Sequence, residues 1–371
     1  MLLKSKPPLV DQYAIDQLRL LHPPAASLIL PPVPHPLFNK VDKDKLARII
    51  KSRLANGSAA GPSGWTGELL AVLIDSNDCL TGLSYIIQDI ANNRLEPHAR
   101  DLLTQSKLFA IPKSETDPTP RPLAIAEPLL KLANLYQLEG LSEPLSALLG
   151  PLQEAVCSPS GCEKAIHVLN AALEARSSAV ESLPVVLLAD ASNAFQTVPR
   201  VEVLSQLFLN SDLSALHGIA SFTYGSPSSL VTLLADNSIE RISSEEGVKQ
   251  GCNLGTILYC IAMQPTFTSA IKDLDVAAKA YADDFSAVGS PVNIAEVINR
   301  LANSNYGLNR SKTKVLWPHF VDPPADVVTL FADLGIQIIR NGAPLLGGYI
   351  TLVVKFLVLF RIKLLLIICE L

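Results

Sequence analysis

The chain has 371 residues, 49% of them hydrophobic, and a formal net charge of −5. This length and apolar content permit one large or two ordinary domains with a sizeable core. The net negative charge excludes a broad basic surface of the kind with which many proteins bind polyanions. Acidic side chains are concentrated in residues 181–300, which carry 13 acidic and 6 basic groups.

Six cysteines in so long a chain do not form a disulfide framework, so we expect thiols in a reducing compartment. The N-terminus has no cationic region followed by a long apolar core. We therefore predict an intracellular protein of the nucleus or cytoplasm, without a secretory signal. Cys157, Cys162 and His167 are spaced like zinc ligands, but a fourth ligand is missing nearby, so a loop followed by a helix is expected there.

The first forty residues contain eight prolines and predict an extended leader with one short helix near residues 11–21. Apolar positions between residues 42 and 54 share one helical face, which predicts a helix. A turn-rich, glycine-containing loop then precedes a second helix at about residues 66–74. Residues 80–103 also have a mostly helical pattern.

Residues 108–113 and 121–125 predict the two strands of a hairpin. Lys113 and Arg121 lie on its opposite sides, where they could clamp a triphosphate or be two solvated cations. Spacing alone does not decide between these alternatives.

The next segment, residues 127–180, has a helical pattern interrupted by Gly150-Pro151 and by residues 158–161. A short apolar run from residue 183 to 189 then predicts a buried strand that ends at Asp190. Residues 201–209 predict a helix, and two apolar runs on either side of residues 236–238 predict a hairpin. The glycine-rich stretch 246–255 precedes a long apolar segment with helical character, and residues 294–301 predict one more helix.

Residues 276–288 predict a hairpin with Asp283 and Asp284 at its bend. Two neighbouring carboxylates at a tight turn repel each other, and a divalent cation such as magnesium or manganese relieves that repulsion. Together with Asp190 they could build a two-metal site. The alternatives are an ordinary polar hairpin tip for the pair and a helix N-cap for Asp190.

Several of these segments resemble the motifs of reverse transcriptases, most closely those of non-LTR retrotransposons. Three palm motifs are similar to Asp190-x-x-x-Ala194-Phe195, Gly247-Val248-Lys249-Gln250-Gly251-Cys252 and Tyr281-Ala282-Asp283-Asp284, in that order. Segments 111–113 and 121–125 resemble the fingers motifs. Segment 307–313 resembles the motif after the catalytic hairpin, and segment 345–348 the start of the primer grip. The resemblance covers about residues 57–348.

The resemblance implies an α+β fold with the fingers and palm of a right-hand polymerase, a small antiparallel palm sheet packed on helices, and no evident thumb. The implied domains are a Pro-rich leader (1–40), an N-terminal extension with fingers (41–180), a palm (181–348) and an atypical hydrophobic tail (349–371). This tail is long enough to span a bilayer. Three cations lie within it, and each costs about 2.5–3.5 kcal/mol at a membrane centre, so we expect no membrane span.

The resemblance also implies site roles. Asp190, Asp283 and Asp284 would bind two Mg²⁺ or Mn²⁺ ions, and Lys312 would donate a proton to the leaving pyrophosphate or be a solvated lysine. Phe195 would block a ribose 2′-hydroxyl, so the product would be DNA, although a core phenylalanine is the alternative. The nucleotide-binding residues would be Lys113, Arg121, Ala191, Phe195, Gln250, Gly251 and Tyr281.

The implied partners are an RNA template, a DNA primer and deoxynucleoside triphosphates, bound weakly and in a salt-sensitive manner because the chain is acidic. Asn253 departs from the family, which usually has proline there. The alternative function is a truncated, inactive retroelement remnant or a co-opted nucleic-acid-binding protein. An RNA-dependent RNA polymerase is disfavoured by Phe195 and by the Tyr-Ala-Asp-Asp sequence. The oligomeric state is not predicted.

Overall fold

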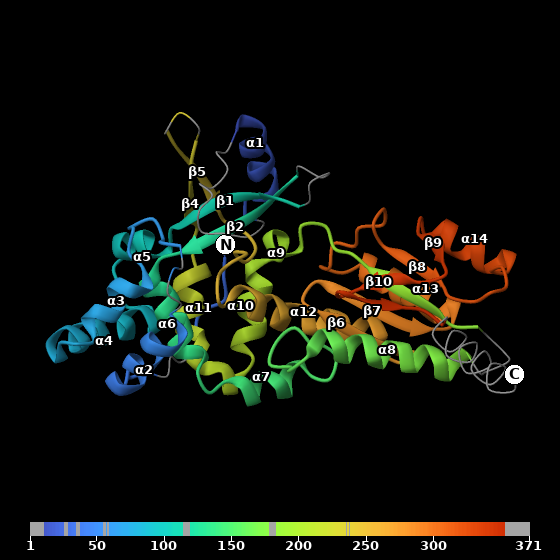
Figure 1. Ribbon diagram of the computed structural model, residues 1–371, viewed down its shortest axis with the longest axis horizontal. Coiled ribbons are helices and arrows are strands. Elements are labelled where there is room, and N and C mark those ends of the chain that lie inside the picture. The colour runs from blue at the N-terminus through green and yellow to red at the C-terminus, as the bar shows by residue number, and fades with distance from the viewer. Residues whose placement is uncertain are drawn as a thin grey trace, which may run out of the picture. The chain divides into compact units, whose positions relative to one another are not determined.

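The computed structural model describes residues 11–352 except 26–28, 35–37, 55–56, 58, 114–118, 178–182, 235 and 237 (Figure 1). The chain forms two compact units, and each is assembled from two separate segments. The first unit comprises Met1–Leu148 and Asn193–Ala262, and the second comprises Leu149–Ser192 and Met263–Leu371. The leader, fingers, palm and tail boundaries expected from the sequence stay a prediction.

Helices dominate the first unit, and two of them begin at capping aspartates. The Asp11 side chain accepts a hydrogen bond from the Ala14 amide at 2.8 Å, and Asp42 accepts one from the Lys45 amide at 2.7 Å. The predicted helices near 11–21, 42–54, 66–74 and 201–209 are confirmed. The helices are α1 (Gln12–Leu21), α2 (Lys43–Arg53), α3 (Gly67–Leu73), α4 (Asn77–Ala91), α5 (Pro97–Thr104), α6 (Pro128–Leu138), α7 (Ser142–Leu149), α9 (Ala194–Thr197), α10 (Arg200–Phe208) and α11 (His217–Tyr224).

One four-stranded sheet, in the order β2-β1-β4-β5, organises the first unit. Both predicted hairpins are confirmed, and a parallel pairing between β1 and β4 joins them. Helix α1 packs on this sheet, with Ile15 and Leu18 buried against Leu108 and Leu230 (Figure 1). The strands are β1 (Ser106–Pro112), β2 (Pro120–Ala126), β4 (Ser228–Leu233) and β5 (Ile239–Ser244).

The second unit contains a five-stranded sheet in the order β6-β7-β3-β8-β9, antiparallel except for β8 and β9. A separate hairpin, β10–β11, follows it. The strands are β3 (Val185–Ala189), β6 (Val276–Tyr281), β7 (Asp284–Gly289), β8 (Lys314–Trp317), β9 (Gln337–Arg340), β10 (Ala343–Leu345) and β11 (Gly348–Ile350). The helices are α8 (Gly161–Ser177), α12 (Gly255–Ile271, within which the two units divide), α13 (Pro291–Ala302) and α14 (Ala325–Asp333).

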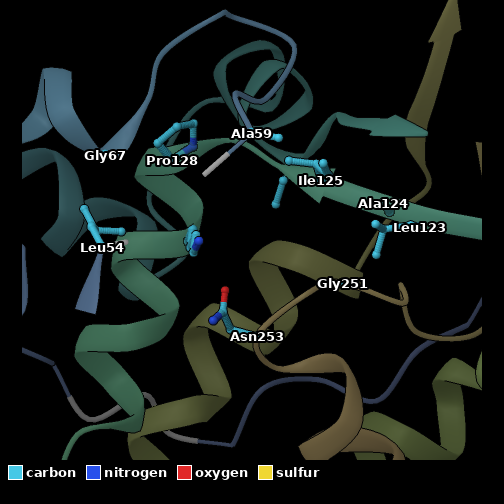
Figure 2. Close-up of a pocket in the computed structure, with 11 residues that line it drawn as sticks. Leu54, Ala59, Gly67, Leu123, Ala124, Ile125, Pro128, Gly251 and Asn253 are labelled. Atoms are coloured by element: carbon cyan, nitrogen blue, oxygen red, sulfur yellow. The ribbon is translucent and has the colours of Figure 1, made fainter. Parts of the chain in front are cut away.

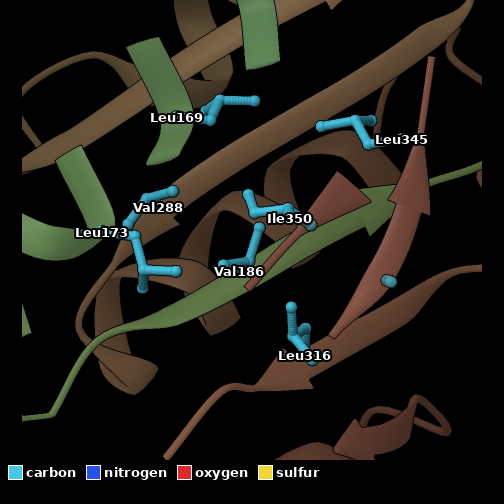
Figure 3. Close-up of a cluster of buried hydrophobic side chains, with 8 residues drawn as sticks. Leu169, Leu173, Val186, Val288, Leu316, Leu345 and Ile350 are labelled. Atoms are coloured by element: carbon cyan, nitrogen blue, oxygen red, sulfur yellow. The ribbon is translucent and has the colours of Figure 1, made fainter. Parts of the chain in front are cut away.

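The core of the second unit lies between α8, one face of the sheet and the β10–β11 hairpin (Figure 3). Val186 pairs with both Val288 and Leu316, so these three side chains share one face. Leu169 of α8 covers them. Ile350 of β11 is fully buried in the same cluster, so the ordered fold continues past position 348. Residues 353–371, most of the expected hydrophobic tail, lie outside the described residues.

The mixed α+β class expected from the sequence is confirmed. Strands β8 and β9 and helix α14 were not predicted, and the helical segment 127–180 has a further break between α6 and α7. The zinc-like spacing proves to be a loop followed by α8, as expected. No disulfide joins the five cysteines in the part of the chain that the structure describes. Among the described helices, none is long and apolar enough to cross a membrane.

Candidate active site

The acids predicted to act together lie at the ends of strands of one sheet in the second unit. Asp190 directly follows β3, Asp283 lies at the bend between β6 and β7, and Asp284 begins β7. Strands β3 and β7 pair with Ala189 facing Phe285, so the next facing positions are Asp190 and Asp284. Strands β6 and β7 form a tight hairpin in which Tyr281 pairs with Asp284. The fold therefore brings the strand-end acid and the hairpin acids into one region.

The hairpin bends at Ala282 and Asp283. Ala282 has a φ of +54°, in the left-handed region that a residue with a Cβ adopts only at a cost of about 1–2 kcal/mol. Such a conformation persists only where surrounding structure holds it, and it is common at functional sites. Phe285, one residue past the acid pair, anchors the hairpin: it is fully buried, and its ring stacks on Phe267 with centroids 5.1 Å apart.

A second loop of the same unit fastens the backbone around Asp190. The Asn309 amide donates to the Asp190 carbonyl at 2.8 Å, and the Asp190 amide donates to the Thr313 hydroxyl at 3.2 Å. Ala191 forms a bridge with Leu308. Lys312 is an exposed residue of this loop, so it lies in the chain segment that contacts the strand-end acid.

The electrostatics of this region favour a cation. The pKa of Asp284 is raised to about 6, first by partial burial of the carboxyl and then by the negative charges of Asp283 and Asp190. Their oxygen donors suit magnesium or manganese in chemistry. Among the described residues, no group of three or more His, Cys, Asp or Glu side chains converges closely enough to hold a metal ion as it stands. The three carboxylates therefore affect one another electrostatically, but as described they do not form a complete set of metal ligands.

Replacing Asp284 with asparagine is expected to stabilise the protein in EDTA at neutral pH. The folded-state pKa of about 6 lies above the ordinary value, so the wild type loses stability as pH rises from about 4 to about 6. The variant should thus melt at a higher temperature than wild type above pH 6 and at the same temperature near pH 4. Thermal melts across this pH range, with Asp326→Asn on exposed α14 as control, test this; an equal gain at both pH values contradicts it.

The first unit carries the two predicted cations at one hairpin tip. Arg121 of β2 pairs with Ile111 of β1, and the Lys113 amide donates to the Thr119 carbonyl at 3.3 Å. Both cationic residues are exposed. Their triphosphate role stays a prediction.

The glycine-rich loop 246–252 of the first unit is tied to two neighbouring segments. The Val248 amide donates to the Phe195 carbonyl at 2.7 Å, and the Ala124 amide of β2 donates to the Gln250 carbonyl at 2.8 Å. The Phe195 ring stacks on Tyr259 with centroids 4.8 Å apart, as a packed phenylalanine does, and its role against a ribose 2′-hydroxyl stays a prediction. Gln250 is half-buried and Gly251 is exposed.

A pocket of about 230 Å³ lies beside this loop (Figure 2). Leu123, Ala124 and Ile125 of β2 line one side, and Gly251 and Asn253 line another. Asn253, the departure from the family pattern, therefore faces this pocket.

Replacing Gly247 with alanine is expected to destabilise the protein by more than about 2 kcal/mol, because two costs combine. Gly247 has a φ of +66°, and a Cβ there would lie 2.3 Å from the Gln196 carbonyl carbon and 2.4 Å from the Phe195 oxygen. Gly64 is a matched control: its φ is +81°, but a Cβ would meet nothing within 4 Å. Urea unfolding should show a loss of about 1 kcal/mol for Gly64→Ala. Equal losses for the two variants would show that the close approach at Gly247 is unimportant.

Two buried cations, Arg200 and Lys249, hold this loop. The sequence alone predicted no role for either of them. Arg200 donates to the Gly247 carbonyl at 3.0 Å and to the Ser244 hydroxyl at 2.8 Å, and Lys249 donates to the Thr104 carbonyl at 2.6 Å. Burial, followed by the charge of Arg200, lowers the pKa of Lys249 to about 7. No local sequence signal distinguishes these side chains from solvated cations.

An α+β fold with acids at a strand end and at a neighbouring tight hairpin defines a candidate nucleotidyltransferase. Residues 111–337, more than half of the chain, match the family described as "Reverse transcriptase (RNA-dependent DNA polymerase)". The chain therefore belongs to the reverse transcriptase family. Over 291 residues it is 24% identical to the "Retrotransposable element SLACS 132 kDa protein" of Trypanosoma brucei gambiense. That alignment covers 77% of this chain and 24% of the trypanosome protein, so the chain spans about a quarter of that relative's length.

Proposed function

We propose that the chain is the RNA-directed DNA polymerase domain of a non-LTR retrotransposon, which adds deoxynucleotides to a primer 3′-hydroxyl on an RNA template. The observation that supports this most directly is the pairing of β3 with β7 up to Ala189 and Phe285, which leaves Asp190 and Asp284 as the next facing positions. Asp283 is adjacent at the hairpin bend. The match to the family and the similarity to a retrotransposable-element protein support the same proposal.

The carboxylates are the proposed ligands of two Mg²⁺ or Mn²⁺ ions, with Asp190 and Asp283 binding directly and Asp284 supporting them. Bound ions of this kind activate an attacking hydroxyl and neutralise a leaving group. The chain itself positions the acids before any substrate binds. The loop that contacts Asp190 and the hairpin anchored by Phe285 hold them in place. Lys312, exposed on that loop, is the proposed proton donor to the leaving pyrophosphate.

Residues of the first unit are proposed for nucleotide contacts. Arg121 and Lys113 are both exposed at one hairpin tip, where a guanidinium and an ammonium can bind a triphosphate. The stacked Phe195 ring is proposed to exclude a ribose 2′-hydroxyl. The proposed nucleotide-binding set also includes Gln250 and Gly251 of the tethered loop, and Ala191 and Tyr281 of the second unit.

The test is primer extension on an RNA template with magnesium or manganese, comparing deoxynucleotides with ribonucleotides. We expect deoxynucleotide incorporation that stops on addition of EDTA and is restored by added metal. Circular dichroism and a cooperative thermal melt establish that the protein is folded. No incorporation by folded protein would overturn the activity and favour an inactive remnant or a co-opted nucleic-acid-binding protein.

A further inference from the structure

A glutamine from outside the catalytic hairpin holds the hairpin's bend. The Gln153 Oε1 accepts a hydrogen bond from the Ala282 amide at 2.8 Å, and its Nε2 donates to the Ala282 carbonyl at 3.2 Å. The Gln153 residue is only 2% exposed. One side-chain amide thus engages both polar groups of the residue whose φ is +54°.

The orientation of this amide is determined by its neighbours. The same Oε1 also accepts a hydrogen bond from the Ala155 amide at 3.1 Å. A flipped amide would turn its NH₂ group toward two N–H donors, so only one orientation satisfies all three contacts.

The backbone on either side of Gln153 pairs with β6, the strand that leads into the bend. The Ala280 amide donates to the Leu152 carbonyl at 2.9 Å, and the Glu154 amide donates to the Ala280 carbonyl at 2.8 Å. Gln153 therefore reaches the bend from a segment whose backbone is already paired with the hairpin.

A tyrosine holds the next peptide of the bend. The Tyr306 hydroxyl donates to the Asp283 carbonyl at 2.8 Å, and its ring packs edge-on against Phe267 with centroids 5.5 Å apart. The carbonyls of Ala282 and Asp283 thus each accept a hydrogen bond from a side chain outside the hairpin. Of the two contacts, the one from Gln153 acts at the residue with the strained backbone.

We propose that Gln153 is a positioning residue for nucleotide addition, because its amide fixes the left-handed Ala282 peptide and thereby the direction of the Asp283 and Asp284 carboxylates. This inference rests on the proposed polymerase function. Without the amide, Ala282 loses two hydrogen bonds and is free to relax toward a common backbone conformation. The strands below the bend keep their own pairing and the buried Phe285, so the change is confined to the acids.

The experiment compares Gln153→Met, which removes both hydrogen bonds to Ala282 and the one from the Ala155 amide, with a matched control, Gln264→Met. Gln264 donates to the Leu149 carbonyl at 3.1 Å in the same unit. That carbonyl also accepts the Gln153 backbone amide, and it is not part of the bend at residues 282–283. For Gln153→Met we expect a fall of about 100-fold in the single-turnover rate with deoxynucleotide affinity unchanged, since small misplacements of catalytic groups have effects of this size. Hydrogen exchange at the Ala282 amide should accelerate in Gln153→Met only.

A second variant keeps the proposal testable if Gln153→Met does not fold. Gln153→Glu retains an acceptor for the Ala282 amide but cannot donate to its carbonyl at neutral pH, so its rate should lie between wild type and Gln153→Met. The proposal is overturned if wild type is active and Gln153→Met matches Gln264→Met in both rate and Ala282 exchange. If wild type shows no incorporation, the proposed polymerase function is wrong. Unchanged hydrogen exchange at the Ala282 amide in Gln153→Met would separately overturn the proposal that Gln153 fixes the bend.

Discussion

Replacing Asp283 with asparagine is expected to reduce the rate of deoxynucleotide incorporation by about 1000-fold while the protein stays folded. The substitution keeps side-chain shape but removes the negative charge proposed to bind metal at the bend between β6 and β7. A loss of about 4 kcal/mol of transition-state stabilisation corresponds to about 1000-fold in rate. Single-turnover primer extension at saturating deoxynucleotide measures this effect.

The matched control for the Asp283 variant is Asp326→Asn in the first turn of α14, which removes an exposed carboxylate of the same unit. Its rate should equal that of wild type. Raising the metal concentration should recover part of the Asp283→Asn rate if the substitution weakens metal binding. A variant with wild-type rate at every metal concentration would refute the assignment of Asp283 as a metal ligand.

Replacing Lys279 with methionine is expected to destabilise the protein by about 3–5 kcal/mol, the usual cost of leaving one member of a buried ion pair without its partner. Lys279 Nζ lies 2.5 Å from a Glu154 carboxylate oxygen, and both side chains are only 10% exposed. Lys279 also donates to the Pro151 carbonyl at 2.5 Å. Urea unfolding, followed by far-ultraviolet circular dichroism, measures the loss.

The pH dependence of stability provides an internal check on this ion pair. Burial alone would raise the pKa of Glu154, but hydrogen bonds from Lys279 and Ser158, together with the positive charges of Lys279 and Lys164, outweigh burial and lower this pKa. In wild type the ionised pair therefore stabilises the fold above the unfolded pKa of about 4.3, and this contribution is lost as pH falls through the folded pKa. In Lys279→Met, burial of the unpaired Glu154 carboxylate raises its pKa, so the loss of stability relative to wild type should become smaller as pH falls and this carboxylate is protonated.

A double variant separates the pair from its surroundings. Glu154→Gln combined with Lys279→Met removes both charges, and it should recover most of the stability lost in Lys279→Met alone. A double variant as unstable as Lys279→Met would show that packing of the lysine stem, and not the unpaired carboxylate, causes the loss.

Local patterns were sufficient to predict the parts of the site that form within a short stretch of chain. The apolar and small residues that flank Asp283 and Asp284, and the apolar run before Asp190, correctly predicted a hairpin and a strand. The sequence alone does not show that these strands are neighbours, because the acids are 93 residues apart. We inferred it from the ability of the acids to bind metal ions together and from the order of the motifs.

Contacts between distant segments account for what the sequence did not predict. Strand β9 pairs in parallel with β8 across the intervening α14, and four-residue strands have too little alternation to predict alone. Gln153 contacts a residue 129 positions away, so nothing in its immediate sequence indicates that role. Lys249 belongs to the glycine-rich stretch 246–255, and nothing in that stretch predicted that the fold buries its side chain.

The burial of Ile350 has a practical consequence for recombinant work on this protein. The motif resemblance ends near residue 348, and a fragment cut there would lose most of β11 and one wall of the core that covers the sheet. An exposed apolar surface of this kind promotes aggregation. Expression boundaries drawn at residue 352 keep that wall in place and omit the hydrophobic residues that follow.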